Sequence, residues 1–133
     1  VLKIPSIIEK PWGHEEVWAS TPRYAGKILF IKKGHRLSRQ YHRIKEETIM
    51  VLDGVLVCEE GSPESESGQI RHRMTPGEIF HVTTGTIHRF CAEETDVRLV
   101  EVSTPELDDV VRLEDDYRRP PSSAPEGGEE NDS

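Results

Sequence analysis

Two segments of the chain carry polar residues spaced as metal ligands would be. Gln40 and His42 are two residues apart, so on a strand their side chains project from the same face, and Glu47 follows in the next stretch. His88 lies in the second segment. Two imidazoles, an amide oxygen and a carboxylate could hold one divalent ion (Zn, Mn, Fe, Co or Ni) with positions left for solvent or substrate. The spacing does not choose among these metals.

The spacing, rather than the number of histidines, carries this interpretation. The chain has six histidines, and a single histidine is more often a surface or core residue than a ligand. His81, seven residues before His88, is a second candidate for the wall of a pocket. The other three, His14, His35 and His72, stand beside charged residues and are expected to be exposed.

Glycines frame both segments. The first reads Gly34-x5-Gln40-x-His42-x4-Glu47-x6-Gly54, and the second reads Gly77-x5-Thr83-x-Gly85-x2-His88. This pattern resembles the paired motifs of the cupin superfamily, in which two short β-motifs supply ligands to one metal in the mouth of a barrel. Most cupins have His where this chain has Gln40, Pro at Thr83 and Asn at Ala92.

A narrower resemblance accounts for the glutamine. The chain is similar to the cupin-type (bacterial type II) mannose-6-phosphate isomerase domain over residues 10–119. The shared landmarks are Lys10-Pro11-Trp12-Gly13, a strand with Lys27 ahead of Gly34, Leu37-Ser38-Arg39-Gln40-Tyr41-His42 and the closing run Asp108-Asp109-Val110-Val111-Arg112 to Tyr117-Arg118-Arg119. In that family Gln, His, Glu and His hold the metal, which the resemblance transfers to Gln40, His42, Glu47 and His88.

The resemblance also implies a substrate and an activity. It points to an aldose–ketose isomerase acting on a sugar or sugar phosphate, with Lys27, Lys45 and Arg112 as substrate-binding cations. Lys45 and Arg112 are also the candidates for a catalytic role, Arg39 and Arg89 are weaker candidates for the pocket, and all five could instead be solvated surface charges. Lys45 stands where the family has Arg, and Arg118 stands where it has Gly. A lysine does not reproduce the bidentate fork of arginine, so the substrate is less defined than the metal site.

Two other functions fit the same residues. His42, Glu47 and His88 would form the two-histidine, one-carboxylate set of a non-haem Fe(II) dioxygenase, with Gln40 as an additional ligand. A non-catalytic cupin that binds a sugar or another metabolite is the third interpretation. The general base of an isomerase is not identifiable from the spacing.

The elements that must position these residues are strands. Period-two runs predict an all-β fold, a jelly-roll barrel of the cupin double-stranded β-helix type with little helix. The predicted strands are Glu16–Ala19, Gly26–Lys32, Glu47–Leu52, Val55–Cys58, Ile70–Met74, Ile79–Thr83, Arg89–Ala92 and Val97–Val102. Asp53-Gly54 predicts a hairpin turn, 61–68 a polar loop, and Thr104-Pro105-Glu106 the start of a short helix.

The composition limits the domain organisation and the partners. Residues 1–119 are expected to form the barrel. The acidic run 120–133 is too polar to bury enough apolar surface to offset its loss of conformational entropy, so it is expected to be a disordered tail. A net charge of −8 argues against general nucleic-acid binding. Cys58 and Cys91 are too few for a disulfide scaffold and are predicted to be core residues.

The location and assembly are also expectations. No apolar run is long enough to cross a membrane, and the first residues lack the apolar stretch of a secretory signal, so a cytoplasmic location is expected. The resemblance to cupins implies a homodimer that pairs through the N-terminal segment.

Overall fold

The computed structural model describes residues 1–61 and 70–121 of the chain. The predicted polar loop at 61–68 and the predicted acidic tail at 120–133 lie almost entirely outside these residues, so both stay predictions, as does the domain boundary at residue 119. Within the described residues the chain forms eleven strands and no helix, which confirms the all-β prediction. That part of the chain accordingly contains no helix able to cross a membrane.

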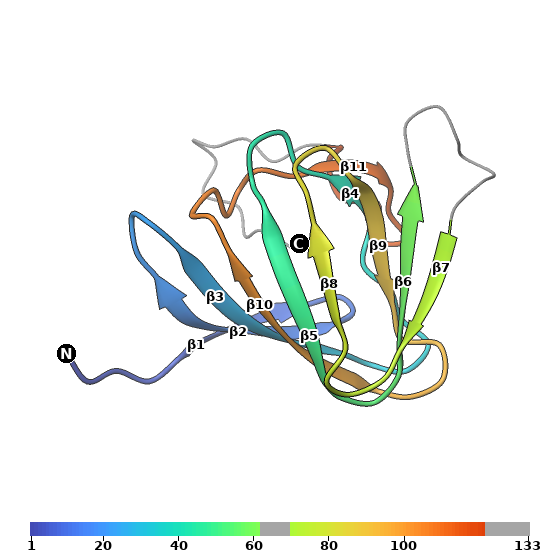
Figure 1. Cartoon of the computed structure of the whole chain (residues 1–133), viewed down its shortest axis with the longest axis horizontal. Coiled ribbons are helices and arrows are strands. Elements are labelled where there is room, and N and C mark those ends of the chain that lie inside the picture. Colours follow the sequence, from blue (N-terminus) through green and yellow to red (C-terminus); the bar gives the residue numbers. More distant parts are fainter. Residues whose placement is uncertain (62–69, 122–133) are drawn as a thin grey trace.

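The strands form two antiparallel sheets that face each other and enclose the core (Figure 1). The first sheet has the order β1 (Ser6–Lys10), β2 (Gly13–Ser20), β3 (Ala25–Ile31), β10 (Val97–Ser103), β5 (Glu47–Asp53) and β8 (Ile79–Val82). The second has the order β11 (Val111–Glu114), β4 (Arg39–Tyr41), β9 (Ile87–Cys91), β6 (Leu56–Gly61) and β7 (Ile70–Met74).

The core is built by alternate residues of facing strands. Leu29 of β3, Leu99 of β10 and Val51 of β5 are cross-strand partners in one row of the first sheet, and all three are buried. Phe90 and Cys58 form the matching buried pair on the second sheet. Alternation therefore sends every second residue of these strands into the barrel, as the period-two pattern predicts.

The Asp53-Gly54 pair makes a turn but not a hairpin, which corrects the sequence prediction. Gly54 has a positive φ of 84°, and a Cβ there would meet the backbone oxygen of Asp96. The runs on either side do not pair with each other, because β5 pairs with β8 and β10 while β6 pairs with β7 and β9. The turn carries the chain from one sheet to the other.

The predicted helix after Thr104 is also wrong. Residues 104–110 form turns, with short-range bonds such as Leu107 N–H to the Pro105 carbonyl (2.7 Å) and Asp109 N–H to the Glu106 carbonyl (3.2 Å). The hydroxyl of Thr104 accepts the N–H of Glu46 (3.1 Å) and so is not used as a helix cap. Long-range bonds to the loop between β4 and β5 therefore decide the conformation of this segment.

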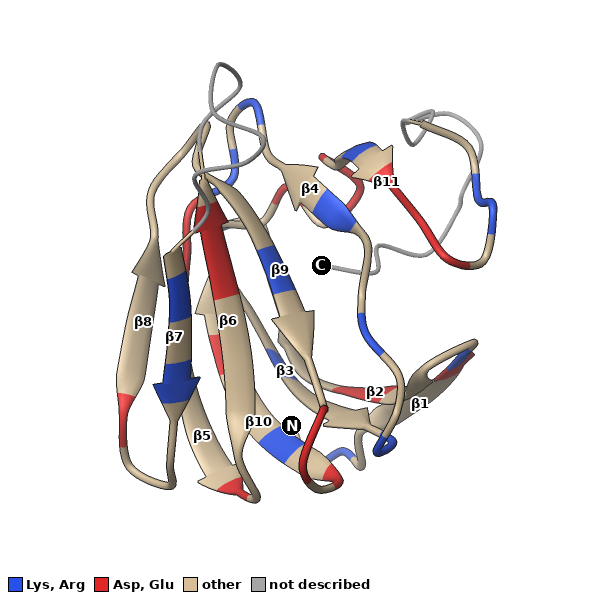
Figure 2. Cartoon of the chain, turned by 90° about the vertical axis from the view of Figure 1, so that its right-hand side faces the viewer, with Lys and Arg blue, Asp and Glu red and all other residues tan. Residues whose placement is uncertain are grey.

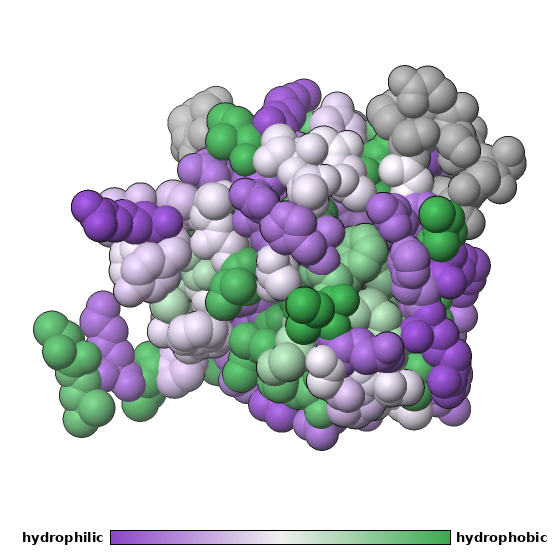
Figure 3. All heavy atoms as spheres, in the orientation of Figure 1, coloured by the Kyte–Doolittle hydropathy of each residue, from purple (hydrophilic) through white to green (hydrophobic). Residues whose placement is uncertain are grey.

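The outer faces of the two sheets differ in character. In the second sheet, arginines on β4, β7 and β9 and glutamates on β6 make the strands rich in charge (Figure 2), and the exposed Arg73 of β7 pairs with Glu94. The first sheet has an outward row across all six strands: Ile7, Glu16, Ile28, Val100, Met50 and Ile79. Apolar side chains gather in the middle of that face (Figure 3).

Candidate metal centre

One aspartate, Asp109, contacts both the His42 ring and the loop that follows His42. The Asp109 carboxylate accepts the backbone N–H groups of Arg43 (3.1 Å), Ile44 (2.6 Å) and Lys45 (2.8 Å). The backbone carbonyl of Asp109 accepts Nδ1–H of His42 at 2.5 Å. Partial burial raises the pKa of the Asp109 carboxyl, but these N–H donors outweigh it and the net pKa is lowered. The His42 tautomer that results leaves Nε2 without a proton, as a metal ligand requires.

His88 on β9 is oriented in the same way. Its Nδ1–H donates to the backbone carbonyl of Thr86 (2.9 Å), which leaves Nε2 as the acceptor nitrogen. Burial lowers the pKa of the imidazole to about 4, so the ring is neutral near pH 7. The ring centroids of His88 and His42 are 5.1 Å apart.

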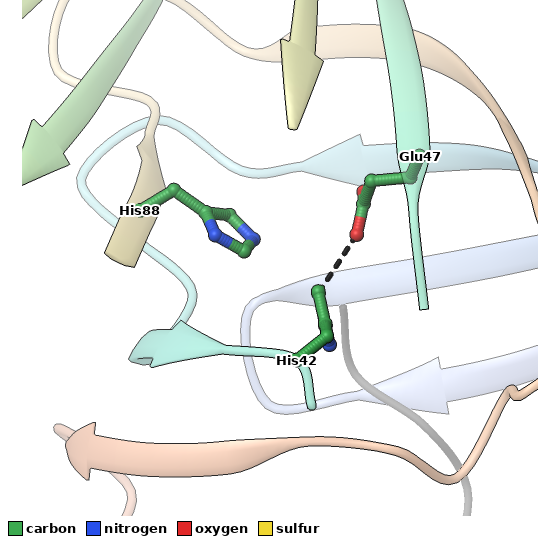
Figure 4. A group of neighbouring side chains, drawn as sticks. All are labelled: His42, Glu47 and His88. Carbon is green, nitrogen blue, oxygen red and sulfur yellow. Dashed lines mark ion pairs between the residues drawn. The ribbon is translucent and has the colours of Figure 1, made fainter. Parts of the chain in front are cut away.

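Glu47, the first residue of β5, faces both rings (Figure 4). Its Oε1 lies 2.8 Å from His42 Nε2, yet the two atoms are not aligned as a hydrogen bond. Two ligands about 2.1 Å from one ion at a right angle would be separated by roughly 3 Å, which is close to this spacing. Burial raises the pKa of Glu47, but Lys45 and the two histidines outweigh it, and the net pKa lies well below its usual value.

Gln40 of β4 lies beside this group. It is the direct cross-strand partner of His88, so both side chains point into the barrel. Gln40 Nε2 donates to the Ser38 hydroxyl (2.8 Å), and this bond orients the amide so that Oε1 is the atom left over.

The four residues share one property that a metal would explain. Among the described residues, Gln40 Oε1, His42 Nε2, both Glu47 oxygens and His88 Nε2 are buried without a hydrogen-bond partner. Buried polar atoms without a partner are costly, and a bound cation satisfies such atoms together. Ligand atoms of His42, Glu47 and His88 all lie within 4.8 Å of one another, so this group could bind a metal ion.

A line of buried charges leads away from Glu47. Lys45 Nζ lies 3.6 Å from Glu47 Oε1 and 3.2 Å from Glu101 Oε2, and none of the three side chains is exposed. Further along, Lys27 Nζ lies 3.1 Å from Glu15 Oε1, again in the interior. Burial raises the pKa of Glu101 to about 7 and also raises that of Glu15. Burial alone would lower the pKa of Lys45, but Glu101 and Glu47 outweigh it and raise the net value.

The predicted substrate cations are not solvated surface charges, which corrects that alternative. Lys27, Lys45, Arg39, Arg89 and Arg112 are all buried, at 9% exposure or less. The two lysines contact the carboxylates just described. Arg89 donates to the Leu37 carbonyl (2.8 Å) and lies 3.4 Å from Asp116, while Arg39 lies 3.7 Å from Glu114.

Arg112 lies next to one candidate ligand in the second sheet. It is the cross-strand partner of Gln40, on the inner face of β11, and its Nη1 donates to the Pro120 carbonyl (2.9 Å). His81, in contrast, points outward, where it contacts the Thr48 hydroxyl and Glu46, both at 2.8 Å. It does not line the barrel interior, so that expectation is wrong.

Sequence reasoning missed the carboxylates that support the site. Glu101 could have been noticed, because it follows Val97 and Leu99 at period two on the apolar face of β10. Asp109 acts partly through its backbone carbonyl, which leaves no trace in the sequence. Cys58 and Cys91 are buried free thiols, as predicted.

The family comparison agrees with the sequence motifs. The profile of the family described as mannose-6-phosphate isomerase C-terminal matches residues 2–115. No curated protein matches the chain.

Solved structures show the fold. CapF of Staphylococcus aureus, a capsular polysaccharide assembling protein, superposes with a TM-score of 0.74 and 19% identity, over 83% of this chain and 34% of CapF. The chain thus spans about a third of that protein. KdgF from Halomonas sp. superposes with a TM-score of 0.65 and 20% identity, over 76% of this chain and 88% of KdgF. A cupin-superfamily sugar phosphate isomerase from Silicibacter pomeroyi superposes with a TM-score of 0.61 and 18% identity, over 83% of this chain and 74% of the isomerase. The predicted cupin double-stranded β-helix is therefore confirmed.

Proposed function

The chain belongs to the mannose-6-phosphate isomerase C-terminal family of cupins, and we propose that it is a metal-dependent aldose–ketose isomerase of a sugar or sugar phosphate. The observation that carries the proposal is the group of buried ligand atoms without hydrogen-bond partners on Gln40, His42, Glu47 and His88. These four residues would hold one divalent ion of the group Zn, Mn, Fe, Co and Ni. When bound, such an ion polarises a sugar carbonyl and stabilises the negative charge that develops on its oxygen.

The residues around the ion have separate tasks in this proposal. Lys45 keeps Glu47 ionised and is the positioning residue of the site, because its ammonium contacts Glu47 and Glu101 in the interior. Lys27 contacts Glu15 in the interior. Arg112, beside Gln40 on the inner face, is the cation best placed to bind an anionic group of the substrate.

One experiment tests the activity together with the metal. The purified full chain would be analysed for bound elements, stripped with a chelator, reloaded with each of the five metals, and assayed for interconversion of mannose 6-phosphate and fructose 6-phosphate. We expect turnover that requires metal and disappears in a His42→Ala, His88→Ala double variant. A His81→Ala variant is the matched control, because His81 lies on the outer face of the first sheet. A fully loaded protein that neither binds nor converts sugar phosphates would contradict the proposal.

A second candidate activity is favoured by the same geometry. His42, Glu47 and His88 alone form a two-histidine, one-carboxylate group, the ligand set of non-haem Fe(II) oxygenases. Oxygen uptake by the iron-loaded protein without aldose–ketose interconversion would support the dioxygenase. Binding of a sugar phosphate without turnover under any metal would support a non-catalytic binding protein.

We also propose that the chain forms a homodimer and is cytoplasmic, the latter in keeping with the two buried free thiols. Pairing through the N-terminal strand β1 stays a prediction, and we propose that the outer face of the first sheet, to which β1 belongs, is where the second copy packs. Three apolar side chains of its outward row, Ile7, Met50 and Ile79, are 56%, 37% and 67% exposed. Six strands at about 4.8 Å spacing make this row about 24 Å wide. Across a two-fold axis the row can pack against itself with few charges opposed.

A further inference from the structure

One inward row of the second sheet contains a carboxylate that the metal site leaves unused. Arg112, Gln40, His88 and Glu60 are successive cross-strand partners on β11, β4, β9 and β6. Direct partners in antiparallel strands project from the same face, with Cβ atoms about 4.5–5.5 Å apart. Glu60 therefore points into the barrel next to His88, on the side away from Gln40.

His72 on β7 holds this carboxylate. Its Nε2 donates to Glu60 Oε1 at 2.9 Å. The ring faces inward, because His72 is the cross-strand partner of the core residue Cys58, and it packs 5.4 Å from the ring of Phe80. His72, expected to be exposed, is thus half-buried, with its ring between the two sheets.

The exposure of this pair differs from that of the candidate ligands. The side chains of His72 and Glu60 are 38% and 37% exposed, whereas His42, Glu47 and His88 are exposed by no more than 1%. The pair thus lies on the inner face of the second sheet and is still reached by solvent. Glu60 is thus a carboxylate that solvent reaches and that stands one strand away from the candidate ligand His88.

We propose that Glu60 is the general base of the isomerisation and that His72 is its positioning residue; this inference rests on the function proposed above. The Glu60 carboxylate takes the proton from C2 of the aldose as the C2–H bond breaks. The electron pair forms a C1–C2 double bond, and the carbonyl oxygen at C1 becomes an oxyanion. Glu60 then returns its proton to C1, while the C2 hydroxyl proton moves to the C1 oxygen and C2 becomes the carbonyl. No oxidant or co-reactant is consumed.

The chain provides a matched control for the simpler interpretation that His72 and Glu60 are an ordinary cross-strand ion pair. His81 Nε2 lies 2.8 Å from Glu46 Oε2, with side chains 48% and 51% exposed. This second pair has the same chemistry, nearly the same distance and similar exposure, but it lies outside the barrel. Effects specific to the inner pair therefore report its position rather than the loss of an ion pair.

The test uses the metal-loaded full chain and the variants Glu60→Gln, Glu60→Asp and His72→Gln, with Glu46→Gln and His81→Gln as controls. The readouts are metal content, kcat, KM, and deuterium incorporation into the sugar carbon in heavy water. We expect Glu60→Gln to keep its metal and to lose kcat and deuterium incorporation by about 10²–10⁴-fold. Glu60→Asp should recover part of the rate, and His72→Gln should lower kcat with little change in KM. Both control variants should keep kcat and deuterium incorporation within about twofold of the unmodified chain.

Each result bears on one of the two claims. If Glu60→Gln is fully loaded and keeps its kcat within about threefold, the base is wrong and the isomerase stands. If Glu60→Gln loses its metal, Glu60 belongs to the metal site and the base is again wrong. If His72→Gln and His81→Gln lose the same amount of kcat, His72 is not a positioning residue. An unmodified chain that shows neither turnover nor deuterium incorporation with any metal overturns the proposed function and the base with it.

Discussion

The backbone carbonyl of Asp109 lies 2.5 Å from Nδ1 of His42, although 67 residues separate the two in the chain. The same residue's carboxylate caps three consecutive backbone N–H groups of the loop that follows His42. One residue near the C-terminal end of the domain therefore fixes both the tautomer of a candidate ligand and the path of its loop. Asp109 of the closing Asp108-Asp109 run therefore orients the candidate metal centre.

The first prediction concerns this clamp. Asp109→Ala should weaken metal binding by about 10–100-fold, because the ligand loop loses its orientation, and should destabilise the protein by about 1–3 kcal/mol. Competition with a chelator measures the first effect and urea unfolding the second. The neighbouring Asp108→Ala is the control, and equal metal affinities in the two variants would contradict the clamp.

The second prediction concerns the buried cation. Lys45→Met leaves Glu47 and Glu101 buried without the ammonium that contacts both, so we expect a loss of about 3–5 kcal/mol in the free energy of unfolding. Adding Glu101→Gln should restore part of it. Arg98→Met, which removes an exposed partner of Asp53, should cost no more than about 1 kcal/mol. If Lys45→Met unfolds at the same urea concentration as Arg98→Met, the buried charges are not coupled.

The third prediction concerns Gln40, the candidate ligand in which this chain departs from most cupins. A Gln40→Ala, His42→Ala variant should contain no tightly bound metal by elemental analysis, whereas His72→Ala should be loaded like the unmodified chain. Gln40→His should retain metal, since imidazole is the ligand that most cupins place there. Unchanged metal content in the double variant would rule out the assigned site.

The sequence was most informative where one face of a strand is buried. The alternation in β3, β5 and β10 follows directly from burial of every second residue, so those strands and their inward faces were predictable. The strands β1, β4 and β11 were missed, and the three residues of β4 are too few to show a period. The paired glycine-framed motifs predicted that His42 and His88 would converge, and ligand atoms of both lie in the same group as Glu47.

The remaining features depend on contacts that no local pattern encodes. Lys45 lies in a charged loop sequence, and its burial follows only from the carboxylates that the barrel places around it. The segment after Thr104 has the residues of a helix start, but Glu46 uses the threonine hydroxyl instead. The turn at Gly54 was predictable from its residues, whereas the sheet that each flanking strand joins is set by long-range pairing.

The fourth prediction concerns pH. Burial lowers the pKa of His88 to about 4 from an ordinary value of 6.5, so between these values the unfolded chain binds a proton that the folded chain does not. The contribution of His88 to the free energy of unfolding of the metal-free protein should therefore fall as the pH is lowered from about 7 to about 4, by up to about 1.4 kcal/mol per unit. Glu101 contributes the opposite slope below its raised pKa of about 7. Comparing urea unfolding of the unmodified chain and His88→Gln isolates the imidazole, and parallel pH profiles would contradict its burial as a neutral ring.

The fifth prediction concerns the apolar outer face of the first sheet. Met50 lies within its six-strand row and is 37% exposed. If a second copy covers this face, Met50→Glu brings two carboxylates into an apolar contact and should convert a dimer of twice the 15.1 kDa chain mass into monomer. On a monomer the same change is a surface substitution and should alter stability by no more than about 0.5 kcal/mol. Sedimentation equilibrium measures the mass, and Arg73→Glu on the charged face of the second sheet is the control. A Met50→Glu protein that stays dimeric, or an unmodified chain that is monomeric at every concentration, would show that this face is not the interface.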